Sequence, residues 1–335
     1  MNTLDIIVPH YKEHWSVCKY LFDTIACQRG ILFDNLRVVV VNDGKQTDSN
    51  LSVDDLEDMQ LLYPFAVDFY TKEHAGVSAA RNYGLDLSKA DYVMFCDADD
   101  GFLNNYGLHL VFSAMQEGFD FLVSNFVEET FDKDGNPQIA PHNQDMTFMH
   151  GKVYRREFLL EHGLRFDETM NIHEDGYFNM LTWSVVQHEG KSKNISTPIY
   201  LWRWNDNSVV RKNREDFVLR TYEDVIRTRT GLCNELKRRG YEDDFRTAVC
   251  MTVVNSYYDF QKPRYHLSKN AKYLRVAEKV FRKFWMQYQK TFYDLTNEKV
   301  AEVAGVARAN ACKNGMLMER QDLRSFLKHI EYEVK

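Results

Sequence analysis

Residues 92–100 of this chain read Tyr-Val-Met-Phe-Cys-Asp-Ala-Asp-Asp. The first five are apolar and predict a buried β-strand, and Asp97, Asp99 and Asp100 follow directly. Carboxylates this close repel one another, so a bound cation would stabilise them. Hard divalent cations such as Mg²⁺ or Mn²⁺ take oxygen ligands, and a substrate phosphate often completes their coordination. The alternative is a plain acidic turn, because Asp favours turns.

Strands and helices alternate around this segment. Residues 4–8, 36–41 and 66–70 predict three more strands, the first of them stopped by Pro9, and the spacing of apolar residues predicts helices over 15–28 and 76–87. The run of valines in the second strand suits burial on both faces of a parallel sheet. This alternation predicts an α/β domain built from βαβ units.

Polar clusters stand where three of these strands end. They are Pro9-His10-Tyr11, Asn42-Asp43-Gly44 and Asp97-Ala98-Asp99. Ligands of open α/β sheets bind at the carboxyl ends of the strands, so these clusters predict one nucleotide-sized site. Taken singly, an aromatic residue after Pro9 can also be rim packing, and Asn-Asp-Gly can be an ordinary turn.

The middle of the chain mixes extended and helical patterns. Residues 121–127 predict a strand, and residues 132–136 predict a hairpin turn. Helical spacing covers residues 152–162 and 175–187, and residues 199–202 predict the last strand.

After residue 213 the pattern becomes purely helical. Apolar residues recur every three or four positions up to Gly240, then up to Pro263, and again around residues 280–288 and 323–330. We therefore expect an α/β domain over residues 1–213 and an all-helical domain over 214–335. Such stripes are usually core, and the helical domain is expected to bind an acceptor, mediate homo-oligomerisation or contact a membrane surface.

Composition narrows the class of protein. The 335 residues include 42 Lys and Arg against 49 Asp and Glu, a net charge of −7, which argues against a surface devoted to nucleic acid but leaves a local basic patch open. The six cysteines form no CxxC pair, which favours reduced thiols over a zinc site. No basic-then-apolar leader precedes the first strand, and no apolar run approaches the about 20 residues of a membrane helix. We expect a cytoplasmic protein with at most peripheral membrane contact.

Three further segments carry charged residues at positions that suit ligand binding or catalysis. In residues 74–84, Gly76 and small residues precede Arg81, as a helix start packed on a ligand requires. Glu174 and Asp175 open a predicted helix, where they serve either the helix dipole or general base catalysis. Residues 202–214 cluster Arg and Lys around Ser208 and form either an anion clamp or a solvated linker.

In this order and spacing, the segments resemble the family 2 glycosyltransferases with a GT-A fold. The likeness covers roughly residues 1–213, about two-thirds of the chain, and the Arg-x-x-x-x-Ser-x-x-Arg segment resembles members that decorate wall teichoic acids. The matching pieces are IIVPHYKE (6–13), VVVVNDGK (38–45), HAGVSAARNYGLDLSKADYVMFCDADD (74–100), GKVYRREFLLEHGLRFDE (151–168), HEDGYFN (173–179) and residues 203–211.

The resemblance implies a donor site for a nucleotide-diphosphate sugar, with a UDP-sugar expected. Pro9 and Tyr11 would line the base pocket, and Asp43 would bind a uracil-like base. Arg81 would lie beside the base or the diphosphate, and Ala98 would contact the donor between the two acids of the metal motif.

The resemblance also implies the catalytic groups. Asp97 would hold ribose or metal, and Asp99 would coordinate Mn²⁺ or Mg²⁺. Asp175 would be the catalytic base, with Glu174 shaping the acceptor or sugar site.

The resemblance assigns fewer roles to residues outside these motifs. Arg203 and Arg211 are candidates for phosphate contacts. Lys45 stands where many members have Ser, and residues 214–335 carry no motif to compare.

These implications predict an inverting, metal-dependent transfer of a sugar to a hydroxyl of a glycan or polymer, with a nucleic-acid acceptor as a lesser alternative. Two rival functions remain from the residues alone. A nucleotidyltransferase also uses strand-end carboxylates, metal and nucleotide. A catalytically inactive sugar-nucleotide-binding scaffold would use the helical part to hold a partner.

Overall fold

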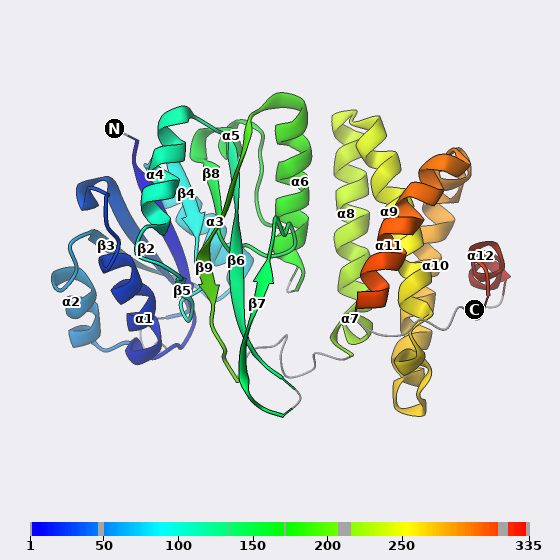
Figure 1. The fold of residues 1–335 in the computed structure, drawn as a ribbon, viewed down its shortest axis with the longest axis horizontal. Helices are drawn as coiled ribbons and strands as arrows, with labels where there is room; N and C mark the ends of the chain where they lie inside the picture. The colour runs from blue at the N-terminus through cyan, green and yellow to red at the C-terminus, as the bar shows by residue number, and fades with distance from the viewer. Residues whose placement is uncertain are drawn as a thin grey trace. The chain divides into compact units, whose positions relative to one another are not determined.

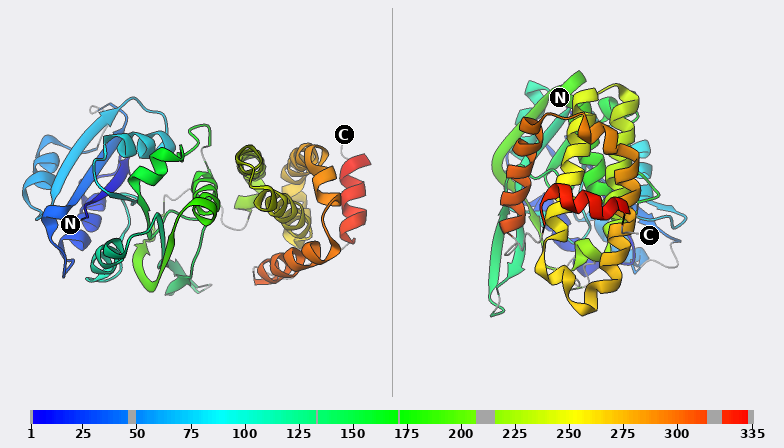
Figure 2. Two further views of the ribbon diagram at one scale, coloured as in Figure 1. Left: turned by 90° about the horizontal axis from the view of Figure 1, so that it is seen from above. Right: turned by 90° about the vertical axis from the view of Figure 1, so that its right-hand side faces the viewer.

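The computed structural model describes residues 2–45, 50–132, 134–170, 172–206, 216–313 and 321–332. The chain forms two compact units, Met1–Asp206 and Asn207–Lys335 (Figures 1 and 2). The boundary predicted between residues 213 and 214 lies outside the described residues.

One mixed sheet forms the centre of the first unit, with the strand order β3-β2-β1-β4-β8-β6-β9-β5 and with β7 paired to β6. Strands β3, β2, β1 and β4 are parallel, β8 runs antiparallel to both β4 and β6, and β9 is parallel to β6. The strands are β1 (Leu4–His10), β2 (Leu36–Asp43), β3 (Ala66–Lys72), β4 (Tyr92–Phe95), β5 (Gly101–Phe102), β6 (Phe121–Phe131), β7 (Pro137–His142), β8 (Lys152–Arg155) and β9 (Ser192–Trp202).

Helices cover both faces of this sheet (Figure 1). Alternate residues of a strand point to opposite faces. Ile6 and Val8 of β1 therefore share a core with the buried residues of α1 and α4, whereas Ile7 lies against α3. The helices of this unit are α1 (Trp15–Ala26), α2 (Val53–Leu61), α3 (Val77–Leu87), α4 (Gly107–Glu117), α5 (Arg156–Glu161) and α6 (Glu174–Glu189).

The small residues at the start of α3 allow a close approach to the sheet. A Cβ atom added to Gly84 would lie 2.4 Å from Cγ2 of Ile7, so a larger residue there would push the helix outward. Ala79 and Ala80 are likewise buried, at 4% and 0% exposure. The packing brings the buried Arg81, on the same helix, to the carboxyl edge of the parallel strands.

The predicted α/β class is confirmed, with three local corrections. The strand from Leu4 does not stop at Pro9 but continues to His10. Pairing with β4 ends at Ile7, so the missing N–H of Pro9 removes no ladder hydrogen bond on that side. Helices α2 and α4 were not predicted. Strand β9 begins at Ser192 rather than Ile199, because pairing with β6 extends a polar segment that has no strand pattern.

The helix predicted over residues 152–162 is wrong in its first part. Residues Lys152–Arg155 form β8, and the helix begins only at Arg156. Val153 and Tyr154 are fully buried, and β8 pairs on one side with β4 and on the other with β6. Two sets of ladder hydrogen bonds therefore outweigh the helical spacing of the local sequence.

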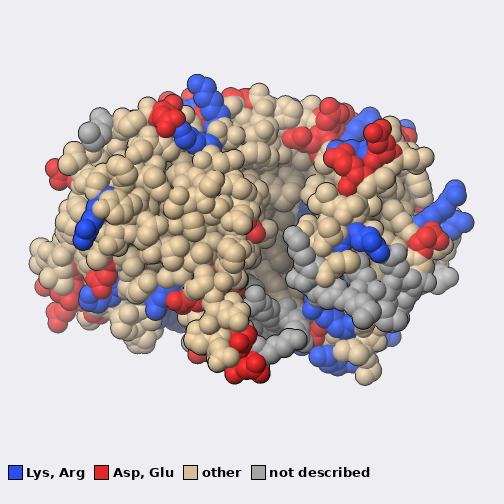
Figure 3. All heavy atoms as spheres, viewed as in Figure 1, with Lys and Arg blue, Asp and Glu red and all other residues tan. Residues whose placement is uncertain are grey.

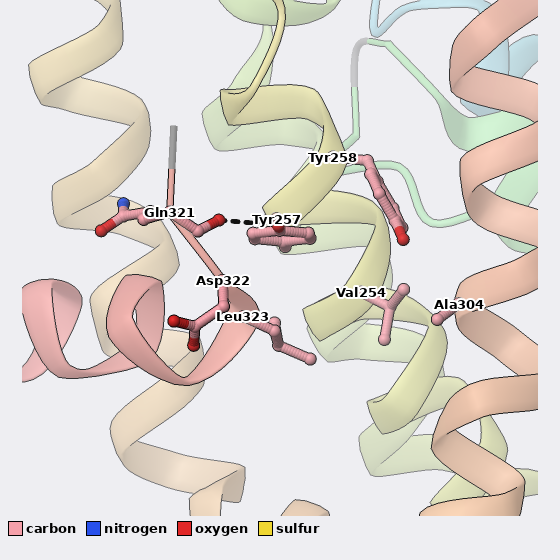
Figure 4. Close-up of a pocket in the computed structure, with 7 residues that line it drawn as sticks. All are labelled: Val254, Tyr257, Tyr258, Ala304, Gln321, Asp322 and Leu323. Atoms are coloured by element: carbon pink, nitrogen blue, oxygen red, sulfur yellow. Dashed lines mark hydrogen bonds between the residues drawn. The ribbon is translucent and has the colours of Figure 1, made fainter. Parts of the chain in front are cut away.

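The second unit is all-helical within the described residues, as predicted. Helix α8 ends at Gly240, which adopts the left-handed conformation (φ 78°) and lets its N–H donate to the carbonyl of Leu236. Helices α9, α11 and α12 border a cavity of about 410 Å³ lined by Tyr257 and Tyr258 among others (Figure 4). The helices are α7 (Phe217–Arg220), α8 (Tyr222–Arg239), α9 (Glu242–Phe260), α10 (Ala271–Tyr293), α11 (Asn297–Lys313) and α12 (Leu323–Tyr332).

None of the helices in the described ranges has the length and apolarity needed to cross a bilayer.

A histidine on β7 makes stability depend on pH. His142 stacks on Phe126 with ring centroids 4.3 Å apart, and its ring nitrogens lie 3.1 Å from Glu128 and 3.6 Å from Asp145. Hydrogen bonds to Asp145 and Glu128 raise the pKa of His142 to about 9, although burial opposes them. The stabilisation is therefore complete below the unfolded-state value of about 6.5 and is lost as pH rises through about 9.

We expect His142→Gln to lower the free energy of unfolding by roughly 1–3 kcal/mol at pH 6 and by less at pH 10. Urea unfolding of both proteins at the two pH values measures this difference. An equal loss at both values would show that packing against Phe126, rather than the charge, carries the stabilisation.

Candidate functional site

A cleft of about 320 Å³ opens at the carboxyl ends of β1, β2 and β4. The register places Pro9 opposite Val41 and His10 opposite Asn42, which brings the first two polar clusters side by side. The cleft is lined by Pro9, His10, Tyr11, Glu13, Asp43, His74, Gly76, Val77, Ala80, Arg81, Asp97, Ala98 and Asp99. All the residues that we expected at the base, ribose and metal therefore lie around one cavity.

Asp43 is held by four groups from the segment before α3. Lys72 Nζ donates to Oδ1 (3.0 Å), and the backbone N–H groups of Ala75 (2.9 Å) and Gly76 (2.7 Å) donate to the two oxygens. His74 Nδ1 lies 2.8 Å from Oδ2. Burial raises the pKa of Asp43, but the hydrogen bonds from Ala75, Lys72 and Gly76 outweigh it and lower the pKa below its ordinary value. Asp43 therefore fixes the loop that forms one wall of the cleft.

Two stacked rings form the edge of the cleft above this loop. Tyr11 and His74 lie nearly parallel, with centroids 4.5 Å apart, and Tyr11 is 43% exposed. Aromatic faces of this kind stack on planar groups, so the pair can receive a nucleobase.

Arg81 connects three carboxylates beneath the cleft. Its guanidinium is buried, with 3% of the side chain exposed. Nη1 donates to Glu174 (3.0 Å) and to Asp175 (2.7 Å), and Nη2 donates to Asp97 (2.9 Å). Residues on α3, on α6 and after β4 thus meet at one cation, which compensates only part of their negative charge.

The negative charge that Arg81 leaves uncompensated affects the pKa values of Asp175 and Asp97 differently. Burial, followed by the neighbouring Glu174 and Asp97, raises the pKa of Asp175 well above its ordinary value, although Arg81 opposes this. Burial also raises the pKa of Asp97, but Arg81 and His150 outweigh it and lower the pKa. Oδ2 of Asp175 additionally accepts a hydrogen bond from the N–H of Met149 (3.2 Å), which orients the carboxylate. Asp175 is the more basic of the two.

One group of side chains in the described residues has the donor atoms for a divalent cation. An oxygen of Asp97, an oxygen of Asp100 and a ring nitrogen of His150 lie within 4.8 Å of one another. This group includes Asp97 of the expected pair but not Asp99, whose Oδ2 accepts a hydrogen bond from Asn205 (2.7 Å) at the border of the cleft. Burial lowers the pKa of His150 to about 3, so its imidazole is neutral, as metal ligation requires.

Asp100, the last acidic residue of the motif, is held by hydrogen bonds from the end of β9 and the residue after it. Asp100 accepts hydrogen bonds from the Tyr200 hydroxyl (2.7 Å) and from the N–H of Arg203 (2.9 Å). Burial, then Asp99 and Asp97, raises the pKa of Asp100 well above its ordinary value. These bonds tie the acidic turn to the end of β9.

Of the two arginines expected to contact phosphate, Arg203 and Arg211, the structure describes only Arg203. The Arg203 guanidinium lies 3.9 Å above the ring of Tyr20, and it donates to the carbonyl of Asp99 (3.3 Å). It therefore lies beside the acidic turn, next to the cleft residue Asp99. Arg211 and Ser208 lie outside the described residues.

Sequence reasoning gave no role to several residues of this site. Glu13 belongs to the quoted IIVPHYKE segment, and its carboxylate accepts a hydrogen bond from the N–H of Tyr11 (2.6 Å) inside the cleft. His74 stands in the quoted segment before Arg81, which is a signal that could have been used. His150 lies in the turn before β8 and Tyr200 lies on β9, and no local pattern distinguishes either of them.

Three comparisons with known proteins bear on this site. The family model described as Glycosyl transferase family 2 matches residues 5–174. Glycosyltransferase GlyA of Streptococcus pneumoniae is 27% identical over 236 residues, which is 63% of this chain and 32% of that protein. The minor teichoic acid biosynthesis protein GgaA of Bacillus subtilis is 26% identical over 201 residues, or 52% of this chain and 42% of that protein.

Among solved structures, S. aureus TarS 1–349 in complex with UDP-GlcNAc matches with a TM-score of 0.59 and 18% identity, over 98% of this chain and 91% of that chain. At this identity the likeness concerns the fold. The matched part of the chain spans about a third of the length of GlyA and about two-fifths of the length of GgaA.

Proposed function

Because this chain belongs to glycosyl transferase family 2 and has the GT-A fold predicted from its sequence, we propose that it transfers a sugar from a UDP-sugar to a hydroxyl of a glycan or polymer. The transfer inverts the anomeric centre and depends on Mn²⁺ or Mg²⁺. The observation that carries the proposal is the Arg81 cluster, which joins the wall of a nucleotide-sized cleft to the basic carboxylate of Asp175.

The cleft supports the choice of donor. A base fits against the exposed ring of Tyr11, and the polar groups held by Asp43 border the same wall. The diphosphate then extends toward Arg81 and Arg203, the two cations at the other end. That TarS 1–349 was solved with UDP-GlcNAc supports uridine as the nucleoside.

The donor set fits a divalent cation. Asp97, Asp100 and His150 supply two carboxylate oxygens and a neutral imidazole nitrogen, and Asp99 borders the cleft beside them. When bound, the ion would neutralise negative charge on the leaving diphosphate. In this proposal Asp97, Asp100 and His150 would hold the ion, and Asp99, which borders the cleft beside them, would add a further carboxylate oxygen when donor and metal bind together.

Asp175 performs the proton transfer in this proposal. It accepts the proton of the acceptor hydroxyl while that oxygen attacks the anomeric carbon, and the bond to the diphosphate breaks on the opposite face. The sugar passes directly to the acceptor, so no covalent sugar–enzyme intermediate forms and UDP leaves. The raised pKa of Asp175 makes it a better base than an ordinary carboxylate, and its bonds to Arg81 and Met149 hold it in place. Glu174, also held by Arg81, shapes the acceptor side.

The two units take different roles in this proposal. Every residue lining the cleft belongs to the first unit, which therefore contains the donor site. The helical unit serves acceptor binding or self-association. All six cysteines are free, which agrees with the cytoplasm as the site of action.

We expect Asp99→Ala to lose donor and metal binding together, with donor affinity falling at least tenfold, about the effect of one lost charged hydrogen bond. Isothermal titration with UDP-sugar, with and without Mn²⁺, measures both. Asp134→Ala, in an exposed turn, is the matched control and should bind like the parent. Unchanged metal dependence in Asp99→Ala would remove Asp99 from the donor site.

A screen of donors by thermal shift tests the proposed function. UDP-, GDP-, CDP- and dTDP-sugars are each added with Mn²⁺, and we expect stabilisation by a UDP-sugar that disappears when the metal is chelated. Stabilisation by all four nucleotides alike would contradict base recognition at Tyr11 and Asp43.

A further inference from the structure

The outward face of α10 combines cations with exposed apolar side chains. Val276, Met286 and Tyr293 are 45%, 46% and 59% exposed. The positions recur every three or four residues, so they form one stripe along the helix. The cations of the stripe are Lys272, Arg275, Lys279, Lys283 and Lys290, all of them exposed.

This stripe lacks the charge pairing of an ordinary solvated helix. On α8, Arg238 and Arg239 both pair with Glu235. None of the five cations of the stripe forms an ion pair with any described residue, and α10 contains Glu278 as its single acid. Like charges stand four residues apart at 275, 279 and 283, an arrangement that disfavours the helix. In a chain of net charge −7, this concentration of unpaired positive charge on one face suits a negatively charged partner.

Helix α12 extends the same surface. It lies across α10 in the right-hand view of Figure 2, and Trp285 Nε1 donates to the side chain of Glu331 (2.9 Å). Its exposed residues are Arg324, Ser325, Lys328 and Tyr332, the last of them 74% exposed. Arg324 and Tyr332 lie within electrostatic reach of Tyr293. On the face drawn in Figure 3, Lys and Arg side chains form several small groups, many of them next to Asp and Glu side chains.

We propose that this basic face of α10 and α12 docks on an anionic lipid surface. Cations interleaved with Val276, Met286 and tyrosines match a bilayer interface, where basic groups meet acidic headgroups and apolar groups enter the boundary below them. A soluble polyanion would satisfy the cations but leave the exposed apolar groups in water. Four of the five cations of the stripe are lysines, which neutralise diffuse negative charge without the paired geometry that arginine offers. The docking does not depend on sugar transfer.

Vesicle flotation with the full chain tests this surface. We expect binding to vesicles of phosphatidylcholine with a third phosphatidylglycerol, weak binding to phosphatidylcholine alone, and loss of binding at high salt. Lys283→Glu/Lys290→Glu should weaken binding at least tenfold, because each basic residue near the surface contributes severalfold in affinity. Lys89→Glu/Lys191→Glu changes the net charge equally at exposed sites of the first unit and should bind like the parent.

A third variant separates lipid from a soluble polyanion. Met286→Gln keeps the charge and the helix, and it should weaken vesicle binding while leaving the thermal unfolding and the donor-induced thermal shift unchanged. Equal loss in the two double variants, binding to neutral vesicles, or absence of binding to anionic vesicles would overturn the proposal. So would tight binding of soluble polyphosphate that Met286→Gln does not affect, because the face would then serve a polyanion.

Discussion

Asp175→Asn is expected to reduce sugar transfer by about a thousandfold, in the middle of the range for loss of a positioned general base. The amide keeps the size of the side chain and can still accept from Arg81, but it cannot take the proton of the acceptor. Donor binding should persist, because Asp175 does not line the nucleotide cleft. Steady-state rates and donor titration on the same protein separate the two effects.

The stability of this variant provides the control. Asp175 carries its charge against burial and against Glu174 and Asp97, so its neutralisation should leave the protein as stable as the parent or more so. Glu189→Gln, at the other end of α6, should retain activity. Full activity in Asp175→Asn would remove Asp175 as the base, and a joint loss of activity and stability would mean that the residue is structural.

The pH profile offers a second test of the base. Asp175 must be ionised to act, and its pKa is raised well above the ordinary value near 4. We therefore expect kcat/KM of the parent to fall as pH decreases through this raised pKa. An acid limb at the ordinary carboxyl value would contradict the assignment.

Arg81→Met is expected to lower the free energy of unfolding by about 3–5 kcal/mol and to abolish turnover. The substitution leaves Glu174, Asp175 and Asp97 close together without their shared cation. Their repulsion would either open the contact between α3 and α6 or force protonation, and both outcomes disable the base. Urea unfolding and donor titration measure the two losses.

Arg81→Met/Asp97→Asn separates charge from packing. Removing one of the three carboxylates should restore part of the stability lost in Arg81→Met, without restoring transfer. Arg81→Lys should be intermediate in stability, because one ammonium cannot reproduce the two-armed contact with three carboxylates. Stability in Arg81→Met equal to that of the parent would contradict the role of Arg81 as the centre of the cluster.

The sequence predicted which residues meet because parallel strands bring their carboxyl ends to one edge. Pro9, Asp43 and Asp97 lie at or just beyond the carboxyl ends of three adjacent parallel strands, so their convergence needed only the order of strands and helices. Arg81 and Asp175 are 94 positions apart and still meet, but their contact was not predicted, since it depends on how α6 packs over the sheet.

The features of the site that were not predicted depend on β8, which pairs antiparallel with β4 and β6. Strand β8 has a helical pattern, and only pairing with β4 and β6 makes it extended. The same insertion carries His150 to the acidic turn, so the cation-binding group could not be read from a motif that ends at Asp100. In the helical unit, spacing predicted the helices and their apolar faces. That the five cations of the α10 stripe have no ion-pair partner among the described residues depends on tertiary packing, which the sequence does not give.

Product analysis with two substrate sets tests the central claim most directly. The protein is incubated with Mn²⁺ and the UDP-sugar that stabilises it best, and separately with UTP and the matching sugar phosphate. We predict metal-dependent release of UDP from the first mixture, with the sugar passed to water or an added glycan, and no pyrophosphate from the second. Pyrophosphate release would identify a nucleotidyltransferase, and tight donor binding without any product would identify a sugar-nucleotide-binding scaffold; either result would contradict sugar transfer.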